Sequence, residues 1–162
     1  MLKKTLAGIL LGANLIFNSC ENYEKPQTKT TQKTQESPED TLLKTAGNFY
    51  YSGDYELAKK TYSNFLEIKT QKNDSLGIAK AFQNIGIVFE AQGNYNKVSE
   101  YYINSLKIYE NLKDSSRISN IYAGLGLVFY AQNKFEKALE YLKKDSLIKS
   151  EILAREPENL SL

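Results

Sequence analysis

Residues 81–108 read AFQNIGIVFEAQGNYNKVSEYYINSLKI, and this stretch decides the fold. In its first half, apolar and small residues recur every three or four positions, the spacing of one helix face. They are Phe82, Ile85, Gly86 and Phe89. Gly93-Asn94 follows, a pair that ends helices through left-handed backbone conformations. A second apolar helix face comes next, with Tyr95, Val98, Tyr102 and Leu106. The stretch therefore predicts a helical hairpin.

The same pattern occurs three times with a period of forty residues and no gap. Residues 41–68 read TLLKTAGNFYYSGDYELAKKTYSNFLEI, and residues 121–148 read IYAGLGLVFYAQNKFEKALEYLKKDSLI. Ala46, Gly86 and Gly126 align, and a small residue there lets two helices approach closely. We expect these positions to serve packing and not catalysis. A fixed period of this length is the signature of a stacked repeat array.

The sequence also contains residues that are typical of helix starts and helix ends. Ser37-Pro38 offers a serine cap with proline at the first helical position. Asp74-Ser75 and Asp114-Ser115 offer caps forty residues apart. The last helix is expected to run from about Phe135 to Arg155, because Pro157 blocks much further extension.

The repeat resembles the tetratricopeptide repeat. In the second unit the family's signature positions hold Phe82, Ile85, Gly86, Phe89, Val98, Tyr102, Ser105 and Glu110. The resemblance implies an all-α fold of three helix-turn-helix hairpins, stacked as a short right-handed α-solenoid over residues 39–155, with a tail at 156–162. Its units would be 39–78, 79–118 and 119–155. The family's minimal period is 34, so we expect the six extra residues to lengthen the second helix and its connection.

In this family the first helices of successive units line a concave groove that binds peptides. By the family's register, the groove residues that would carry binding are Tyr50, Tyr51, Ile87, Glu90, Leu127 and Tyr130. The family's carboxylate-gripping positions hold Leu43, Gly47, Gln83, Ile87, Ala123 and Leu127, which do not suit that mode. Aromatic and aliphatic anchors instead suit a short helix or an extended peptide. The competing interpretation is that these aromatic residues only cover neighbouring helices.

Residues 1–20, MLKKTLAGILLGANLIFNSC, have the layout of an export signal. A basic start precedes an apolar stretch too short to span a bilayer, and Ser19 comes directly before Cys20. This resembles the bacterial lipoprotein signal, so residues 1–19 would be removed, Cys20 lipidated, and 20–38 would form a disordered tether. Glu21 favours the outer over the inner membrane of the envelope. An ordinary secreted protein and an uncleaved anchor are the alternatives.

Composition excludes several classes of function. The chain has no histidine and one cysteine, which removes histidine-dependent catalysis, histidine-ligated zinc and cysteine metal cages. Its formal charge is +2, and Lys3 and Lys4 account for the excess, so the body is neutral and unsuited to nucleic acid. Glu90 and Glu136 lack a second catalytic group beside them. We therefore expect no enzyme activity, cofactor or metal.

The leading hypothesis is an interaction module held at an envelope membrane by an N-terminal lipid, with an unidentified protein or peptide partner. A second is a self-associating structural protein. Its homodimer would form through the last helix, where apolar residues exceed what one side can bury: Leu139, Leu142, Leu147, Ile148, Ile152 and Leu153. A third is a shortened sensor portion of a bacterial signalling regulator.

Overall fold

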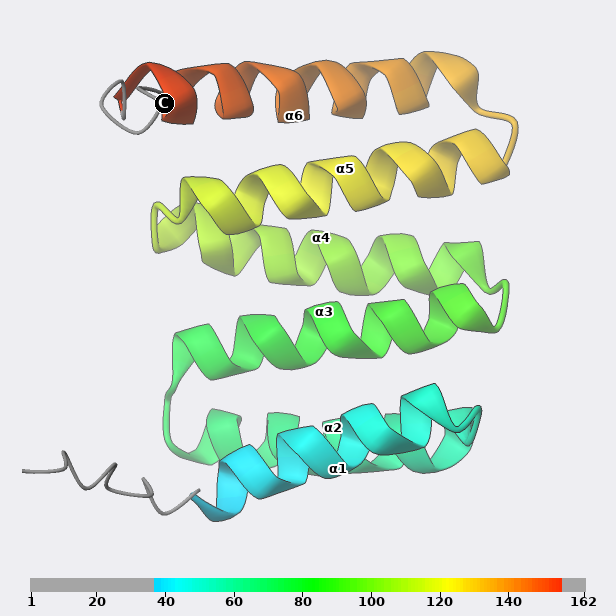
Figure 1. Ribbon diagram of the computed structural model, residues 1–162, viewed down its shortest axis with the longest axis vertical. Coiled ribbons are helices and arrows are strands. Elements are labelled where there is room, and N and C mark those ends of the chain that lie inside the picture. The colour runs from blue at the N-terminus through cyan, green and yellow to red at the C-terminus, as the bar shows by residue number, and fades with distance from the viewer. Residues whose placement is uncertain (1–36, 156–162) are drawn as a thin grey trace, which may run out of the picture. The chain divides into compact units, whose positions relative to one another are not determined.

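The computed structural model describes residues 37–155, and these residues form six helices and no strand. The helices are α1 (Pro38–Tyr51), α2 (Tyr55–Gln71), α3 (Ser75–Ala91), α4 (Tyr95–Asn111), α5 (Ser115–Ala131) and α6 (Phe135–Arg155). They stack in chain order, with α2 behind α1 and α4 partly behind α5 in Figure 1. The expected all-α solenoid of three hairpins is confirmed. The signal, Cys20, most of the tether and the tail 156–162 lie outside the described residues.

The predicted helix caps are present. Ser37 caps α1 and accepts a hydrogen bond from the backbone N–H of Asp40, whose carboxylate in turn accepts from the backbone N–H of Ser37. This reciprocal pair satisfies two amide groups that a helix start leaves without partners. Asp74 and Asp114 cap α3 and α5 by accepting from backbone amides three residues ahead. The described part of the tether thus already belongs to the start of α1.

The turns recur every twenty residues, which is half the forty-residue period of the repeat. Five residues with positive φ stand twenty residues apart: Gly53, Asn73, Gly93, Lys113 and Asn133. Helices α2 to α5 each have 17 residues, and each three-residue turn is followed at once by the next helix. The expectation that the extra residues lengthen the second helix and its connection is wrong. Both helices of the second hairpin have equal lengths, because the Asp74 cap starts α3 well before the aligned repeat.

The core lies between neighbouring helices, and the predicted small positions are points of close approach. A Cβ atom added at Gly86 would lie 2.6 Å from Cε1 of Tyr102, and one added at Gly124 would lie 2.7 Å from its Cε2. The Tyr102 ring is therefore held between α3 and α5. At Gly126 a Cβ atom would lie 2.7 Å from Leu142 Cδ2, so α5 and α6 also approach closely.

Position 105 of the second unit and the equivalent position 145 of the third hold different residues, serine and aspartate, and the structure accommodates both in the interior. Ser105 is buried and donates to the Ala79 carbonyl at 2.8 Å. Asp145 is also buried, and there Ser119 donates its hydroxyl to the carboxylate, which pairs with Lys149 at 2.7 Å. Residues 79 and 119 are also one repeat apart. The Ala79 carbonyl accepts from Ser105, whereas the Ser119 hydroxyl donates to Asp145.

The two ends of the stack differ. At the C-terminal end, α6 exposes Phe135, Leu139, Leu142, Leu147 and Leu153. At the other end, α1 exposes the polar residues Thr41, Lys44 and Asn48. Of the apolar excess predicted for α6, Leu139, Leu142, Leu147 and Leu153 are exposed, whereas Ile148 and Ile152 are partly buried. Within residues 37–155, no helix combines the length and apolarity that a membrane crossing needs.

Candidate functional site

The six predicted groove residues lie on the first helices of the three hairpins, and we call them the first-helix surface. Tyr50 and Tyr51 end α1, Ile87 and Glu90 lie on α3, and Leu127 and Tyr130 lie on α5. Tyr51, Leu127 and Tyr130 are exposed, with 86%, 59% and 62% of their surfaces accessible. Tyr50, Ile87 and Glu90 are partly buried. This surface therefore offers three open apolar or aromatic side chains beside a half-covered carboxylate.

Ile87 differs from the expectation that it points only into the groove. It packs against the core cluster that contains Leu125, Val128 and Phe129. A charged residue there would disturb packing as well as any binding. Leu127, in contrast, is more than half exposed and is the cleaner probe of this surface.

Glu90 is bound to the interior of the stack. Its Oε2 accepts a hydrogen bond from the Tyr102 hydroxyl at 2.8 Å, although Tyr102 itself is only 5% exposed. Burial raises the pKa of Tyr102, and the neighbouring charge of Glu90 raises it further, so the phenol remains a proton donor. The sequence indicated only that Glu90 lies in the groove without a second catalytic group beside it. In the structure Glu90 is partly buried and oriented, because the glycines beside Tyr102 let that ring pass between helices.

A second tyrosine fixes another polar residue of α3. The hydroxyl of Tyr109, a fully buried side chain, donates to Gln83 Oε1 at 3.1 Å. Tyr102 and Tyr109 both lie on α4, and both reach residues on the adjacent face of α3. The polar side chains of α3 are thus held in place by hydroxyl groups that come from the second helix of the same hairpin.

A third tyrosine, Tyr62 on α2, comes close to the first-helix surface without a hydrogen-bond partner among the described residues. Its side chain is 8% exposed, and a Cβ atom added at Gly47 would lie 3.8 Å from its hydroxyl oxygen. No fully buried side-chain N or O atom in residues 37–155 lacks a partner, so this hydroxyl has some access to solvent. Because Gly47 has no side chain, α1 leaves that approach open.

Tyr50 interacts electrostatically with several of these side chains. Burial raises its pKa, and the charges of Tyr55, Glu90 and Tyr51 act in the same direction. The same kind of influence reaches Tyr62 and Tyr102 from Tyr50. The structure therefore places Tyr50 beside Tyr51 and Tyr102 beside Glu90, and the charge of Glu90 acts on Tyr50. The tyrosine at the second-helix position of both units 1 and 2 was the available signal for Tyr102.

Aromatic packing accounts for part of the exposed surface. Tyr50 lies edge-on to Tyr51 with centroids 5.4 Å apart and tilts against Tyr55 at 5.9 Å. Tyr130 lies edge-on to Phe135 at 5.6 Å. Tyr50 and Tyr130 thus contact aromatic rings of the following helix, whereas the ring contact of Tyr51 is with Tyr50 of its own helix. Most of the surface of Tyr51 and Tyr130 stays accessible to a ligand.

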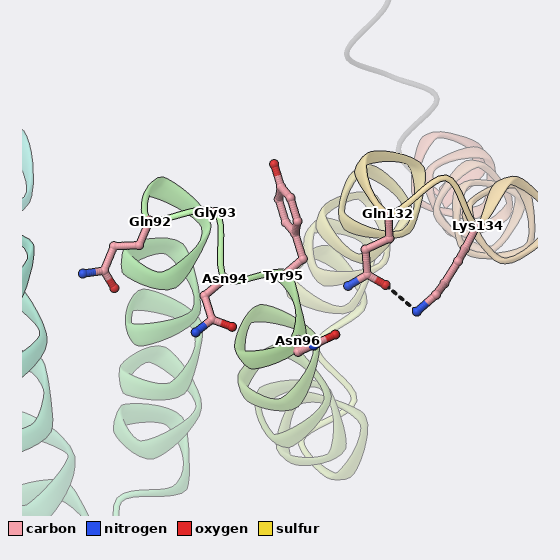
Figure 2. Close-up of a pocket in the computed structure, with 7 residues that line it drawn as sticks. All are labelled: Gln92, Gly93, Asn94, Tyr95, Asn96, Gln132 and Lys134. Carbon is pink, nitrogen blue, oxygen red and sulfur yellow. Dashed lines mark hydrogen bonds between the residues drawn. The ribbon is translucent and has the colours of Figure 1, made fainter.

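Two hollows lie elsewhere, at the turns that join the two helices of each hairpin. The larger is lined by residues of the α3–α4 and α5–α6 turns: Gln92, Gly93, Asn94, Tyr95, Asn96, Gln132 and Lys134 (Figure 2). Its polar side chains partly satisfy one another, since Lys134 donates to Gln132 at 2.7 Å. The smaller is lined by Gly53–Leu57 and Gln92. Neither contains a residue of the first-helix surface.

The acidic side chains of the described residues are not gathered in a cluster. No three or more Asp, Glu, His or Cys side chains in residues 37–155 are placed to hold a metal ion. Glu136, the second carboxylate considered from the sequence, is exposed near the start of α6. The chemistry that the site does offer is recognition through apolar contacts, aromatic faces and one oriented carboxylate.

Comparison with known proteins agrees with this fold. The family model for the tetratricopeptide repeat matches residues 40–68. The crystal structure of the apo form of RapI is 30% identical with a TM-score of 0.65, and the match covers 70% of this chain and 41% of RapI. The chain thus spans less than half of RapI. No match was found among curated proteins.

Two further structures have the same fold. The TPR domain of Arabidopsis FLU is 22% identical with a TM-score of 0.63, and the match covers 67% of this chain and 92% of that domain. BtubC (BKLC) from P. vanneervenii is 18% identical with a TM-score of 0.63, and the match covers 74% of this chain and 50% of BtubC. The fold defines a helical-repeat protein of the α-solenoid class. The matched repeat and these neighbours support a tetratricopeptide-repeat protein, whose fold is a non-catalytic, protein-interaction fold.

Proposed function

We propose that this protein binds a peptide segment of another protein through the first-helix surface, without catalysis and without a cofactor. The observation that carries the proposal is the exposure of Tyr51, Leu127 and Tyr130 on a fold used for protein interaction. Large apolar side chains that stay open on the first helices of the hairpins are suited to anchor a helical or extended ligand. Three hairpins can bury only a modest interface, so a dissociation constant near the micromolar range is expected, about −8 kcal/mol.

The test is a double substitution that leaves the core intact. Tyr51→Asp with Leu127→Asp places charges on two exposed side chains, so helicity should stay unchanged while captured clients are lost. The matched control is Leu57→Asp with Leu112→Asp, two exposed leucines outside this surface. Clients crosslinked in native membranes are identified by mass spectrometry. If the Tyr51/Leu127 variant and the wild type capture the same clients, this surface is not the binding face.

We further propose that the module is exported and anchored to an envelope membrane, more readily the outer than the inner one, through lipid on Cys20. The support is the sequence of residues 1–21 alone. Two or three acyl chains, at about 0.8 kcal/mol per buried methylene, give stable anchoring where one chain is marginal. Cys20→Ala should release the protein or leave it unprocessed. Metabolic labelling with a fatty-acid analogue checks this, and an unlabelled wild-type protein would contradict it.

Self-association through α6 is a second candidate function, because α6 exposes a stripe of apolar residues. Phe135, Leu139, Leu142 and Leu153 follow helical spacing along one side of the helix and remain 38–62% exposed. Light scattering over a range of concentrations tests a homodimer, with Leu139→Lys and Leu142→Lys as the disrupting pair. A wild-type protein that stays strictly monomeric at high concentration would leave this stripe to a different protein.

A further inference from the structure

The polar part of the first-helix surface has a definite chemical character, and it is anionic. Glu90 is partly buried, and none of the ion pairs formed among residues 37–155 includes it. Only Oε2 accepts from Tyr102, so Oε1 is left for another donor. Removing a carboxylate from water without a cationic partner is unfavourable unless a ligand or water supplies hydrogen bonds.

Two tyrosine side chains are linked to Glu90, Tyr102 by a hydrogen bond and Tyr50 by charge, and they offer a hydroxyl group and an aromatic face. Tyr50 lies close enough for the Glu90 charge to raise its pKa. Phenol oxygens accept hydrogen bonds, and tyrosine faces attract cations. An anion would be repelled by the same carboxylate.

We propose that Glu90, together with Tyr50 and Tyr102, forms a subsite for a lysine or arginine side chain of the bound peptide. This inference rests on the proposed function and specifies its ligand. Glu90 supplies the charge, the Tyr102 hydroxyl holds one carboxylate oxygen in place, and the other oxygen accepts from the ligand.

The neighbouring apolar residues set the rest of the ligand. Ile87 and Glu90 are three residues apart on α3, so they lie on the same side of that helix about 5–6 Å apart. Leu127 lies on α5 and is exposed. A peptide that fits would carry a basic residue next to apolar ones, and an acidic residue at the same place would be rejected.

The experiment uses fluorescent nine-residue peptides with two leucines three or four positions apart. Each peptide carries Arg, Gln or Glu next to a leucine, and binding to the wild type is measured by anisotropy. The Arg peptides should bind about tenfold more tightly than the Gln peptides, and Glu peptides more weakly still, the scale of one charge-assisted hydrogen bond. Glu90→Gln should remove the preference, and Glu90→Lys should reverse it toward Glu peptides.

The matched control is Glu110→Gln. Glu110 also accepts a hydrogen bond from a tyrosine, Tyr122 at 3.2 Å, but it lies on α4 outside the site. This variant should bind like the wild type, and thermal unfolding confirms that every variant is folded. Equal binding of the three peptide types, or a preference that survives Glu90→Gln, overturns the cation subsite while peptide binding stands. Binding that is absent for all peptides, or that survives Tyr51→Asp with Leu127→Asp, overturns the proposed function as well.

Discussion

Tyr102 of the second hairpin and Leu142 of the third occupy the same repeat position, yet Tyr102 is 5% exposed and Leu142 is 38% exposed. Tyr102 is enclosed by glycines of α3 and α5, whereas Leu142 contacts Gly126 of α5 and has no following hairpin in the described chain. The same position is therefore a core site in the interior of the stack and a surface site at its edge. Substitutions at equivalent positions should separate these two environments.

The largest difference is expected for truncation at this position. Tyr102→Ala removes a buried ring and its hydrogen bond to Glu90, which should lower the free energy of unfolding by about 3–5 kcal/mol. Leu142→Ala should cost at most about 2 kcal/mol, because part of that side chain already contacts water. Chemical denaturation of both variants measures the difference. Equal costs would mean that α6 is covered in solution.

A polar pair gives the next comparison. Ser119→Ala removes the hydroxyl that Asp145 accepts, a hydrogen bond to a charged group worth about 1.5–3 kcal/mol. Ser105→Ala removes a bond to the Ala79 carbonyl, a neutral pair worth about 0.5–1.5 kcal/mol. The variants are compared by denaturation at neutral pH. A greater loss for Ser105→Ala would show that Lys149 alone satisfies Asp145.

Alanine substitutions at the glycines compare a methyl group placed against an enclosed side chain with one placed against a side chain that can move. Gly86→Ala forces a methyl group against the enclosed Tyr102 ring and should cost about 1–3 kcal/mol. Gly126→Ala meets Leu142, which can change rotamer at the open edge, so its cost should be smaller. Gly47→Ala is the control: its methyl group meets only a hydroxyl at 3.8 Å, and alanine favours helix by up to about 1 kcal/mol. Thermal unfolding should show the largest loss of stability for Gly86→Ala, a smaller loss for Gly126→Ala and the least for Gly47→Ala.

The smallest effect is a pH dependence at the N-terminal end. Hydrogen bonds from Lys69 and Lys72 hold the pKa of Glu39 below its ordinary value of 4.5. Its contribution is therefore present above that ordinary value and is lost as the pH falls through the lower folded pKa. Glu39→Gln should flatten the acid limb of the stability curve. Glu140→Gln on α6 should flatten it less, because Glu140 has one lysine partner where Glu39 has two.

Much of the fold was predictable because the repeat is consistent at every level. The helix faces, the caps at Ser37, Asp74 and Asp114, and the close approach at Gly86 all follow from local pattern and chemistry. The helix lengths did not, because the alignment compared only 28 residues of each unit and left out the capped first turns. The alignment also gave no reason to single out Lys113, whose φ is +56° in a turn.

The site was predictable to a lesser degree. The register of the repeat identifies which residues of α1, α3 and α5 face outward. It does not identify which of them accept hydrogen bonds from side chains of the second helices. The hydrogen bond between Tyr102 and Glu90 joins residues twelve positions apart, and it depends on how closely α3 and α4 cross. Ile87 illustrates the same limit, because a residue on the outward face can still pack against the core of the next hairpin.

The twenty-residue spacing of the turns makes the molecule modular. Residues 75–114 begin with the serine that follows Asp74 and end with Asp114, which precedes another serine. A duplicated copy of this block placed after Asp114 would meet its neighbours through the same Asp-Ser junction at both ends. Each such duplication would lengthen the ligand-facing row by one helix, whereas a twenty-residue insertion would invert the roles of every helix beyond it. The chain therefore grows or shrinks without redesign only in steps of forty residues.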